Sequence, residues 1–328
     1  MRNHRFVLVA LLAVAGILVA GTVGHAADPQ FTKAVRIIVP YAPGGSSDIL
    51  ARLIGPHLSK AIGQPVIVEN KQGATGNIGA DFVAKAEKDG HTMLLTDVGA
   101  LAAAPNLFSK LSYDVEKDLT PVGMVMFAPY ILAVHPSVPV KTVAELVAYA
   151  KANPSKLNLG HSGVGNANHL TGIVLAKYWG ITWKYIPYKG GAAAIRAVVA
   201  NESNVIINGA LATQSFVTQN QLKGLAVSGT KRLEALKDLP TFKELNLPAV
   251  DSGTWQGIVT TAGTPAPVVM RLNAEIRKIL AMPEIEKKIS DLGGDVRAGS
   301  PEEFTAWLKA NIISWGAVVR EAGIKLEE

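Results

Sequence analysis

The chain has 328 residues, 48% of them apolar, and a formal net charge of +6 at neutral pH. This length and apolar content allow a large buried core, in two domains or one long α/β unit, and exclude a disordered or fibrous protein. The positive residues are scattered rather than clustered with aromatics, which argues against nucleic acid as a partner, and the lack of cysteine excludes disulfides, thiolate metal sites and a cysteine nucleophile.

The first 26 residues are typical of a secretory signal peptide. Two arginines precede a long apolar run, which ends at the small-residue site Gly24-His25-Ala26. We therefore expect cleavage there, export, and a mature chain that begins near Ala27. The alternative is an uncleaved anchor, because residues 6–23 are long enough to span a bilayer, but no basic stop-transfer run follows them. No later stretch is long and apolar enough to cross a membrane, so we expect the exported product to be soluble.

Short β-branched runs alternate with helical patterns along the rest of the chain, which predicts an α/β fold with mostly parallel sheets. The predicted strands span residues 35–39, 66–69, 92–96, 131–134, 157–159, 184–186, 204–208, 225–228 and 257–261. Amphipathic spacing predicts helices over residues 46–62, 284–292 and 304–319. Thr142 with Glu145, and Ser300 with Glu303, are predicted capping boxes.

Two interruptions of this pattern suggest a boundary between domains. Around residues 124–129 and 247–254, proline, glycine and serine break the pattern, and an apolar strand follows each break. If both are crossover strands, residues 27–127 and 251–328 form one domain and residues 128–250 a second. A two-segment hinge would then place a ligand site between the domains. The alternative is two ordinary surface loops within a single domain.

Two similar turns lie about half the chain apart, PYAPGGS at residues 40–46 and PYKGG at residues 187–191. Each follows a predicted strand and opens a predicted helix, and the glycines permit tight turns with positive φ. The first N–H groups of a helix have no internal partners and favour an anion. Tyr41 and Tyr188 are candidates to face the ligand, with half-buried packing as the alternative. Asp48 should brace its loop, because a carboxylate beside a bound anion would repel it.

Two further glycine-rich turns follow predicted strands, GATGN at residues 73–77 and GHSGVGN at residues 160–166. For each of the four, the alternative is an ordinary turn without a ligand. Ligands of open α/β sheets bind outside the carboxyl ends of the strands. Four such turns, two in each predicted domain, would therefore surround one cleft with N–H donors and hold a small anionic ligand.

Enzyme signatures mostly fail. The stretch 160–164 misses the nucleophile elbow because the second glycine stands at 165, and no complete dinucleotide fingerprint, Walker loop or zinc-helix motif is present. His161 and His169 have no carboxylate at metal-ligand spacing, so we expect neither a metal nor a cofactor. The enzymatic alternative is a secreted α/β hydrolase in which Ser162 and His169 are catalytic.

Six segments, in order along nearly all of the expected mature chain, form the most specific pattern: VRIIVPYAPGGSSDILARLI, VIVENKQGATGNIGADFVAKAEKDGHTMLL, YDVEKDLTPVG, HSGVGNANHL, IPYKGGAAAI and LAVSGTKRLEALKDLPTFKEL. They resemble the substrate-binding proteins of tripartite tricarboxylate transporters, the Bug family of periplasmic receptors. The resemblance implies a monomeric type II periplasmic binding protein whose two α/β lobes close over a small carboxylate. It also implies two membrane subunits as partners, no catalysis, and a ligand held by loop N–H groups, hydroxyls and ordered water rather than by an arginine. A sensory receptor that serves a kinase is an alternative use of the same fold.

The resemblance, read position by position, predicts the following ligand-binding residues: Tyr41, Ala42, Gly44, Gly45, Ser46, Gly73, Ala74, Thr96, Asp97, Ser162, Gly165, Asn166, His169, Tyr188 and Asn208.

Two departures from the family pattern bear on the ligand. Members usually have small or hydroxyl residues where Thr96-Asp97-Val98 stands, and commonly an aspartate in the strand of residues 204–208. An acid at Asp97 would disfavour a second carboxylate and favour an amine, amide or hydroxyl. We therefore predict a ligand with one carboxylate or amide and a donor group, rather than a tricarboxylate.

Overall fold

The computed structural model describes residues 30–248 and 252–323. The predicted signal peptide therefore lies outside the described residues. Within the described ranges, no helix has the length and apolar character needed to cross a membrane.

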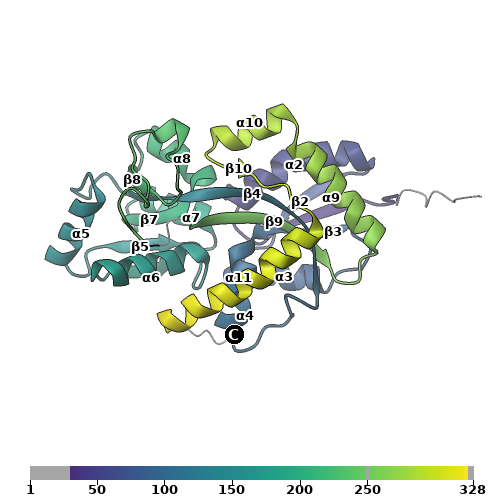
Figure 1. Ribbon diagram of the computed structural model, residues 1–328, viewed down its shortest axis with the longest axis horizontal. Helices are drawn as coiled ribbons and strands as arrows, with labels where there is room; N and C mark the ends of the chain where they lie inside the picture. Colours follow the sequence, from purple (N-terminus) through teal and green to yellow (C-terminus); the bar gives the residue numbers. More distant parts are fainter. Residues whose placement is uncertain (1–29, 249–251, 324–328) are drawn as a thin grey trace, which may run out of the picture. The chain divides into compact units, whose positions relative to one another are not determined.

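A ten-stranded mixed sheet forms the centre of the fold, in the order β2-β1-β3-β9-β4-β7-β5-β6, with β8 and β10 also pairing with β4 (Figure 1). The strands are β1 (Val35–Val39), β2 (Val66–Asn70), β3 (Thr92–Asp97), β4 (Leu119–Val134), β5 (Asn158–His161), β6 (Lys184–Pro187), β7 (Val205–Gly209), β8 (Lys223–Val227), β9 (Gly253–Thr261) and β10 (Asp295–Val296). Each predicted strand overlaps an observed one. Parallel pairing is confined to the two ends of the sheet, β2-β1-β3 and β7-β5-β6, whereas β9 and β4 between them are antiparallel to their neighbours.

Strand β4 passes without a break through residues 124–129, where the sequence pattern is interrupted. Two register shifts against β9, between Pro121 and Gly123 and between Met124 and Met126, accommodate the irregular residues without ending the strand. Up to Pro129 the strand pairs with β9, and from Tyr130 onward it pairs with β7 and β8. One long strand thus connects the two ends of the sheet.

The helices follow the predicted pattern closely. They are α2 (Ser46–Ile62), α3 (Asn77–Ala84), α4 (Val98–Leu107), α5 (Val143–Ala152), α6 (Ala167–Trp179), α7 (Gly191–Val199), α8 (Ala210–Thr218), α9 (Ala266–Leu280), α10 (Pro283–Asp291) and α11 (Pro301–Ala322). Helix α2 has the predicted bounds and buries Leu50, Ile54 and Leu58. The Ser300 capping box is complete. At α5 the Thr142 hydroxyl accepts from the Glu145 N–H, but the Glu145 carboxylate accepts from the Lys141 N–H instead of the cap residue.

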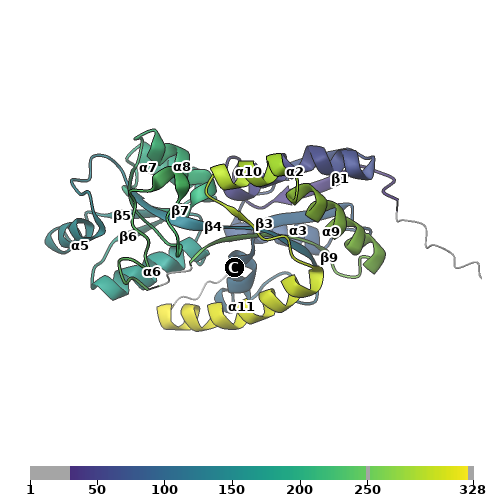
Figure 2. The ribbon, with the colours of Figure 1, turned by 45° about the horizontal axis from the view of Figure 1, so that its top comes forward.

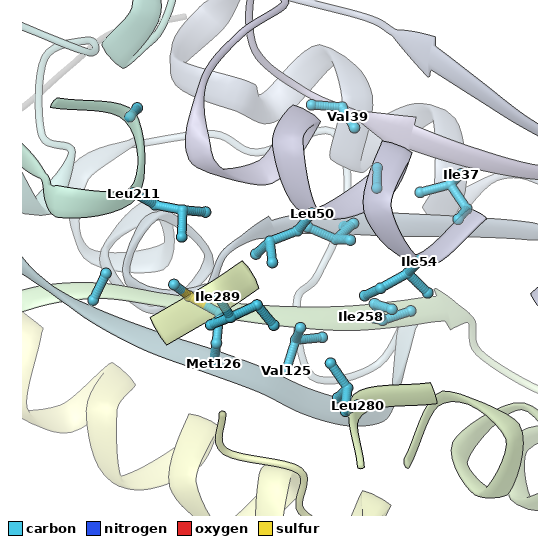
Figure 3. Packing of buried hydrophobic residues seen from close by; sticks show 14 of the residues in the cluster. Ile37, Val39, Leu50, Ile54, Val125, Met126, Leu211, Ile258, Leu280 and Ile289 are labelled. Carbon is cyan, nitrogen blue, oxygen red and sulfur yellow. The ribbon is translucent and has the colours of Figure 1, made fainter. Parts of the chain in front are cut away.

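Both faces of the β1-β3-β9-β4 part of the sheet are covered, because alternate residues of each buried strand point to opposite sides. On one side, Ile37 and Ile258 pack with the apolar faces of α2, α9 and α10, as Figure 3 shows for the labelled residues. On the other side, Ile38 and Val259 pack against α3, α4 and α11. Figure 2 shows α2 and α10 above the sheet and α11 below it. The carboxyl-end turns of the strands are therefore held by helices packed on both faces.

Candidate functional site

The carboxyl ends of the two parallel strand sets face each other. Three antiparallel steps, β3 to β9, β9 to β4 and β4 to β7, separate the two sets, and an odd number of such steps reverses strand direction. Asp97, at the end of β3, is level with Gln256, which pairs with Met126 of β4. Gly209, at the end of β7, pairs with Tyr130 of the same strand. Four residue steps along β4, from Met126 to Tyr130, therefore separate the two sets of strand ends, about 13 Å at the usual rise of a strand.

The two Pro-Tyr/Gly-Gly turns meet at this place. The Ala42 N–H donates to the Lys189 carbonyl at 3.0 Å. Gly190, with φ of +109°, lies so close to Tyr41 that an added Cβ would be 2.9 Å from the Tyr41 Cβ. A side chain at position 190 would push the turns apart, so glycine is required for this contact.

Three helices begin around one cavity. The residues before α2, α7 and α8 are Gly45, Gly190 and Gly209. A glycine cap has no side chain that could accept from the first helical N–H groups, so these donors are available to a ligand. The cavity has a volume of about 40 Å³. Its lining consists of Tyr41, Gly45, Ser46, Ser47, Asp97, Tyr130, Ser162, Asn168, Gly191, Asn208, Gly209, Thr254 and Gln256.

A chain of hydrogen bonds forms one wall of the cavity. The Ser47 hydroxyl donates to Gln256 Oε1 at 2.7 Å, and Gln256 Nε2 donates to Thr254 Oγ1 at 2.6 Å. The Thr254 hydroxyl then donates to Asp97 Oδ2 at 2.9 Å. Every donor in this chain points toward the Asp97 carboxylate, and the chain connects that carboxylate to the first turn of α2.

Two tyrosine hydroxyls in the same cavity remain donors at any ordinary pH. Burial raises the pKa of Tyr41 and of Tyr130, and the negative charge of Asp97 raises both further. The Tyr130 hydroxyl is buried and has no hydrogen-bond partner among the described residues. A buried hydroxyl in that condition is costly, which makes it a candidate to bind whatever enters the cavity.

Comparisons with known proteins agree on the class of protein. The sequence model described as "Tripartite tricarboxylate transporter family receptor" matches residues 50–324. The chain belongs to this family. It is 31% identical over 322 residues to Protein BugT of Bordetella pertussis, covering 97% of this chain and 98% of that one. It is 32% identical over 291 residues to a UPF0065 protein of Pseudomonas sp. (strain P51), covering 88% and 86%.

Solved structures give the same result. The periplasmic binding protein BugD superposes with a TM-score of 0.86 at 32% identity, covering 91% of this chain and all (100%) of that chain. The Rhodopseudomonas palustris protein MatC with bound malate has a TM-score of 0.83 at 30% identity, covering 88% and 99%. The R. palustris protein Rpa4515 with adipate has a TM-score of 0.85 at 31% identity, covering 90% and 99%. These likenesses confirm the predicted fold class, and the family consists of solute-binding proteins rather than enzymes.

The hydrolase alternative is therefore wrong, and the geometry gives the reason. The Ser162 hydroxyl of this receptor donates to Asn168 Oδ1 at 2.9 Å. His169 Nδ1 accepts from the Gly165 N–H at 3.0 Å, and its ring stacks on His161 at 4.2 Å. Burial lowers the pKa of His169 to about 3, with a further lowering from His161. Burial also lowers the pKa of His161 to about 4. A pKa of about 3 makes His169 too weak a base to activate a serine hydroxyl, and its Nδ1 already holds the turn at Gly165.

Six of the predicted site residues line the cavity of the receptor: Tyr41, Gly45, Ser46, Asp97, Ser162 and Asn208. The other nine do not: Ala42, Gly44, Gly73, Ala74, Thr96, Gly165, Asn166, His169 and Tyr188. Most of these nine shape the turns instead. The Gly44 N–H donates to Asp48 Oδ2 at 2.9 Å, so Asp48 braces its loop as predicted. Thr96 and Tyr41 line a small adjoining cavity of about 10 Å³.

Four of the remaining predicted positions lie near contacts between turns or point elsewhere. Next to Gly73 and Ala74, the Thr75 hydroxyl donates to the Val164 carbonyl at 3.2 Å, which joins two of the glycine-rich turns. The Tyr188 hydroxyl lies 3.0 Å from Ser203 Oγ, outside the cavity lining. Asn166 Nδ2 donates to the Ser162 hydroxyl at 3.0 Å and so orients a residue that does line the cavity.

Seven lining residues were missed by the sequence prediction: Ser47, Tyr130, Asn168, Gly191, Gly209, Thr254 and Gln256. Ser47, Asn168 and Gly191 lie within the glycine-rich turns or directly beside them, so the same signal extends to them. Gly209 follows the predicted strand of residues 204–208. Tyr130, Thr254 and Gln256 belong to β4 and β9, and no local motif marks them.

Proposed function

We propose that the protein is a monomeric periplasmic receptor that captures a small carboxylate in this cavity and delivers it to a tripartite tricarboxylate transporter with two membrane subunits. The observation that carries the proposal is the convergence of three helix N-termini, those of α2, α7 and α8, on one cavity. Relatives of known structure were solved with adipate and with malate, which supports a carboxylate as the ligand.

Backbone donors and hydroxyls can hold a carboxylate here without a basic side chain. Each helix N-terminus favours an anion by about 0.3 to 1 kcal/mol when exposed and by more in a shielded site. Ser46, Tyr41 and Tyr130 add hydroxyl groups to the same lining. The weak field of several dipoles, rather than one strong ion pair, allows the ligand to be released again to a transporter.

The proposal includes two lobes that close over the ligand. Residues 27–127 and 251–328 would form one lobe and residues 128–250 the other, with β4 and β9 as the connecting strands. Two contacts already bridge these segments, from the Ala42 N–H to the Lys189 carbonyl and from Thr75 to Val164. A ligand that touches both segments favours the closed state by its difference in affinity for the two states. Small-angle scattering should therefore show a decrease in the radius of gyration on ligand addition.

Export and ligand identity are tested together. The full chain, expressed in a Gram-negative host, should appear in the periplasmic fraction with residues 1–26 removed. Mass spectrometry of the molecules released on denaturation should identify a small carboxylate, and calorimetry of the refolded protein should show that it binds again. Retention of an uncharged sugar, and no binding of any carboxylate, would refute the proposal.

A further inference from the structure

The cavity is electrically asymmetric. Its described lining contains one carboxylate, Asp97, and no lysine, arginine or histidine. The helix N-termini provide a positive pole. Asp97 stands at the other end of the hydrogen-bonded chain that starts at Ser47 in α2 and passes through Gln256 and Thr254. A ligand that fits both poles must carry negative charge at one end and positive charge at the other.

The Asp97 carboxylate lies in polar surroundings. It accepts from the Thr254 hydroxyl, and it immediately precedes α4, where a helix N-terminus favours a negative charge. Its charge acts within the cavity, because it disfavours ionisation of both Tyr41 and Tyr130. A second ligand carboxylate would therefore meet a fixed negative charge, whereas an ammonium group would meet a charge partner.

We propose that the ligand is a small zwitterion, whose carboxylate binds at the N-termini of α2, α7 and α8 and whose protonated amine binds at Asp97. This inference rests on the proposed receptor function and narrows its substrate class. The single negative charge of Asp97 in the cavity excludes a tricarboxylate as the ligand. A dicarboxylate of the same length should bind less tightly than the zwitterion. The polar chain from Ser47 to Asp97 then acts as a positioning element that fixes the carboxylate facing the amine.

Matched probes separate the charge of the ligand from its length. Calorimetry on the refolded protein compares butyrate, succinate, succinamate and γ-aminobutyrate, which differ only in the terminal group. A second set of propionate, malonate and β-alanine repeats the comparison with a chain that is one carbon shorter. We expect the amino compound of at least one set to bind at least tenfold more tightly than its dicarboxylate. Tighter binding of succinate and malonate than of both amino compounds would overturn the zwitterion while leaving the carboxylate receptor intact.

The variant Asp97→Asn removes the charge but keeps an amide oxygen for Thr254 and a good N-cap for α4. It should weaken binding of the amino compound at least tenfold and bring the dicarboxylate to equal or greater affinity. Asp238→Asn is the control, because Asp238 is exposed and outside the lining, and the net charge changes equally. If Asp97 serves only to cap α4, Asp97→Asn will change the affinities for all probes by one common factor, and this result also overturns the inference.

If Asp97→Asn does not fold, the order of probe affinities measured on the wild-type protein tests the inference without it. If none of these probes binds but adipate or malate does, the zwitterion is overturned and the proposed function stands; if no carboxylate binds at all, the proposed function itself fails.

Discussion

Replacing Tyr130 with phenylalanine should weaken ligand binding without weakening the fold. The side chain is 2% exposed, and its hydroxyl has no hydrogen-bond partner among the described residues. An unsatisfied buried hydroxyl costs about 1 to 3 kcal/mol, part of which water in the cavity can offset. Tyr130→Phe should therefore leave the free energy of unfolding unchanged or raise it by about 1 kcal/mol, equivalent to about 1 to 2 °C in Tm for a chain of this length. A hydrogen bond to a charged ligand contributes about 1.5 to 3 kcal/mol, so affinity should fall by about 10- to 150-fold.

Tyr188→Phe is the matched control for this experiment. The Tyr188 hydroxyl has a partner, Ser203 Oγ at 3.0 Å, and Tyr188 does not line the cavity. Loss of the Tyr188 hydroxyl should lower the free energy of unfolding by about 1 kcal/mol and leave the affinity for the ligand unchanged. Urea unfolding of the ligand-free proteins and calorimetry with the ligand that the wild type retains measure both quantities. If Tyr130→Phe loses stability and binds as tightly as the wild type, the hydroxyl has an internal role and the reasoning fails.

Two further predictions concern the turns. The pKa values of His161 and His169 are about 4 and 3 in the folded protein, below the value near 6.5 expected when unfolded. Their contribution to stability is therefore complete above about pH 6.5 and is lost as the pH falls, by about 2 kcal/mol for each ring at pH 5. His169→Leu should reduce the difference in unfolding free energy between pH 7.5 and pH 5 by about 2 kcal/mol in urea titrations, and an unchanged difference would contradict the buried neutral ring. Gly190→Ala should cost about 2 kcal/mol or more and weaken ligand binding, because the position has φ of +109° and faces Tyr41. Gly180→Ala, with φ of +60° and no atom within 4 Å of the added Cβ, controls for backbone strain and should not affect calorimetric binding.

The glycine-rich turns could be predicted from the sequence because their chemistry is local. Gly44, Gly73, Gly165 and Gly190 all have positive φ, the conformation for which glycine is selected. The apolar spacing of α2 likewise fixed its bounds and its buried face. Residues whose role depends only on their own neighbours in the chain were therefore identified, although the same signal also selected turn residues that shape the cavity without lining it.

The polar residues of β4 and β9 could not be predicted in this way. Thr254 and Gln256 lie on the same side of β9 as the buried Ile258, since alternate residues of a strand share a face. A buried face that changes from apolar to polar suggests a site, but only when it is known that both faces of that strand are covered. Gln256 obtains its role from Ser47, which is 209 positions away in the chain, and Thr254 obtains its role from Asp97, 157 positions away.

The two repeated turns face each other because of the relative direction of their strands, which no single segment of the sequence specifies. Similar motifs in two parallel strand sets predict two sets of donors, yet the sets converge only if the strands run in opposite directions. The three antiparallel steps through β9 and β4 provide this reversal. With an even number of steps, both turns would lie at the same edge of the sheet, and the Ala42 to Lys189 hydrogen bond could not form across the cavity. The long strand β4, which the sequence pattern reported only in its last residues, is therefore the element that converts a repeated motif into a binding site.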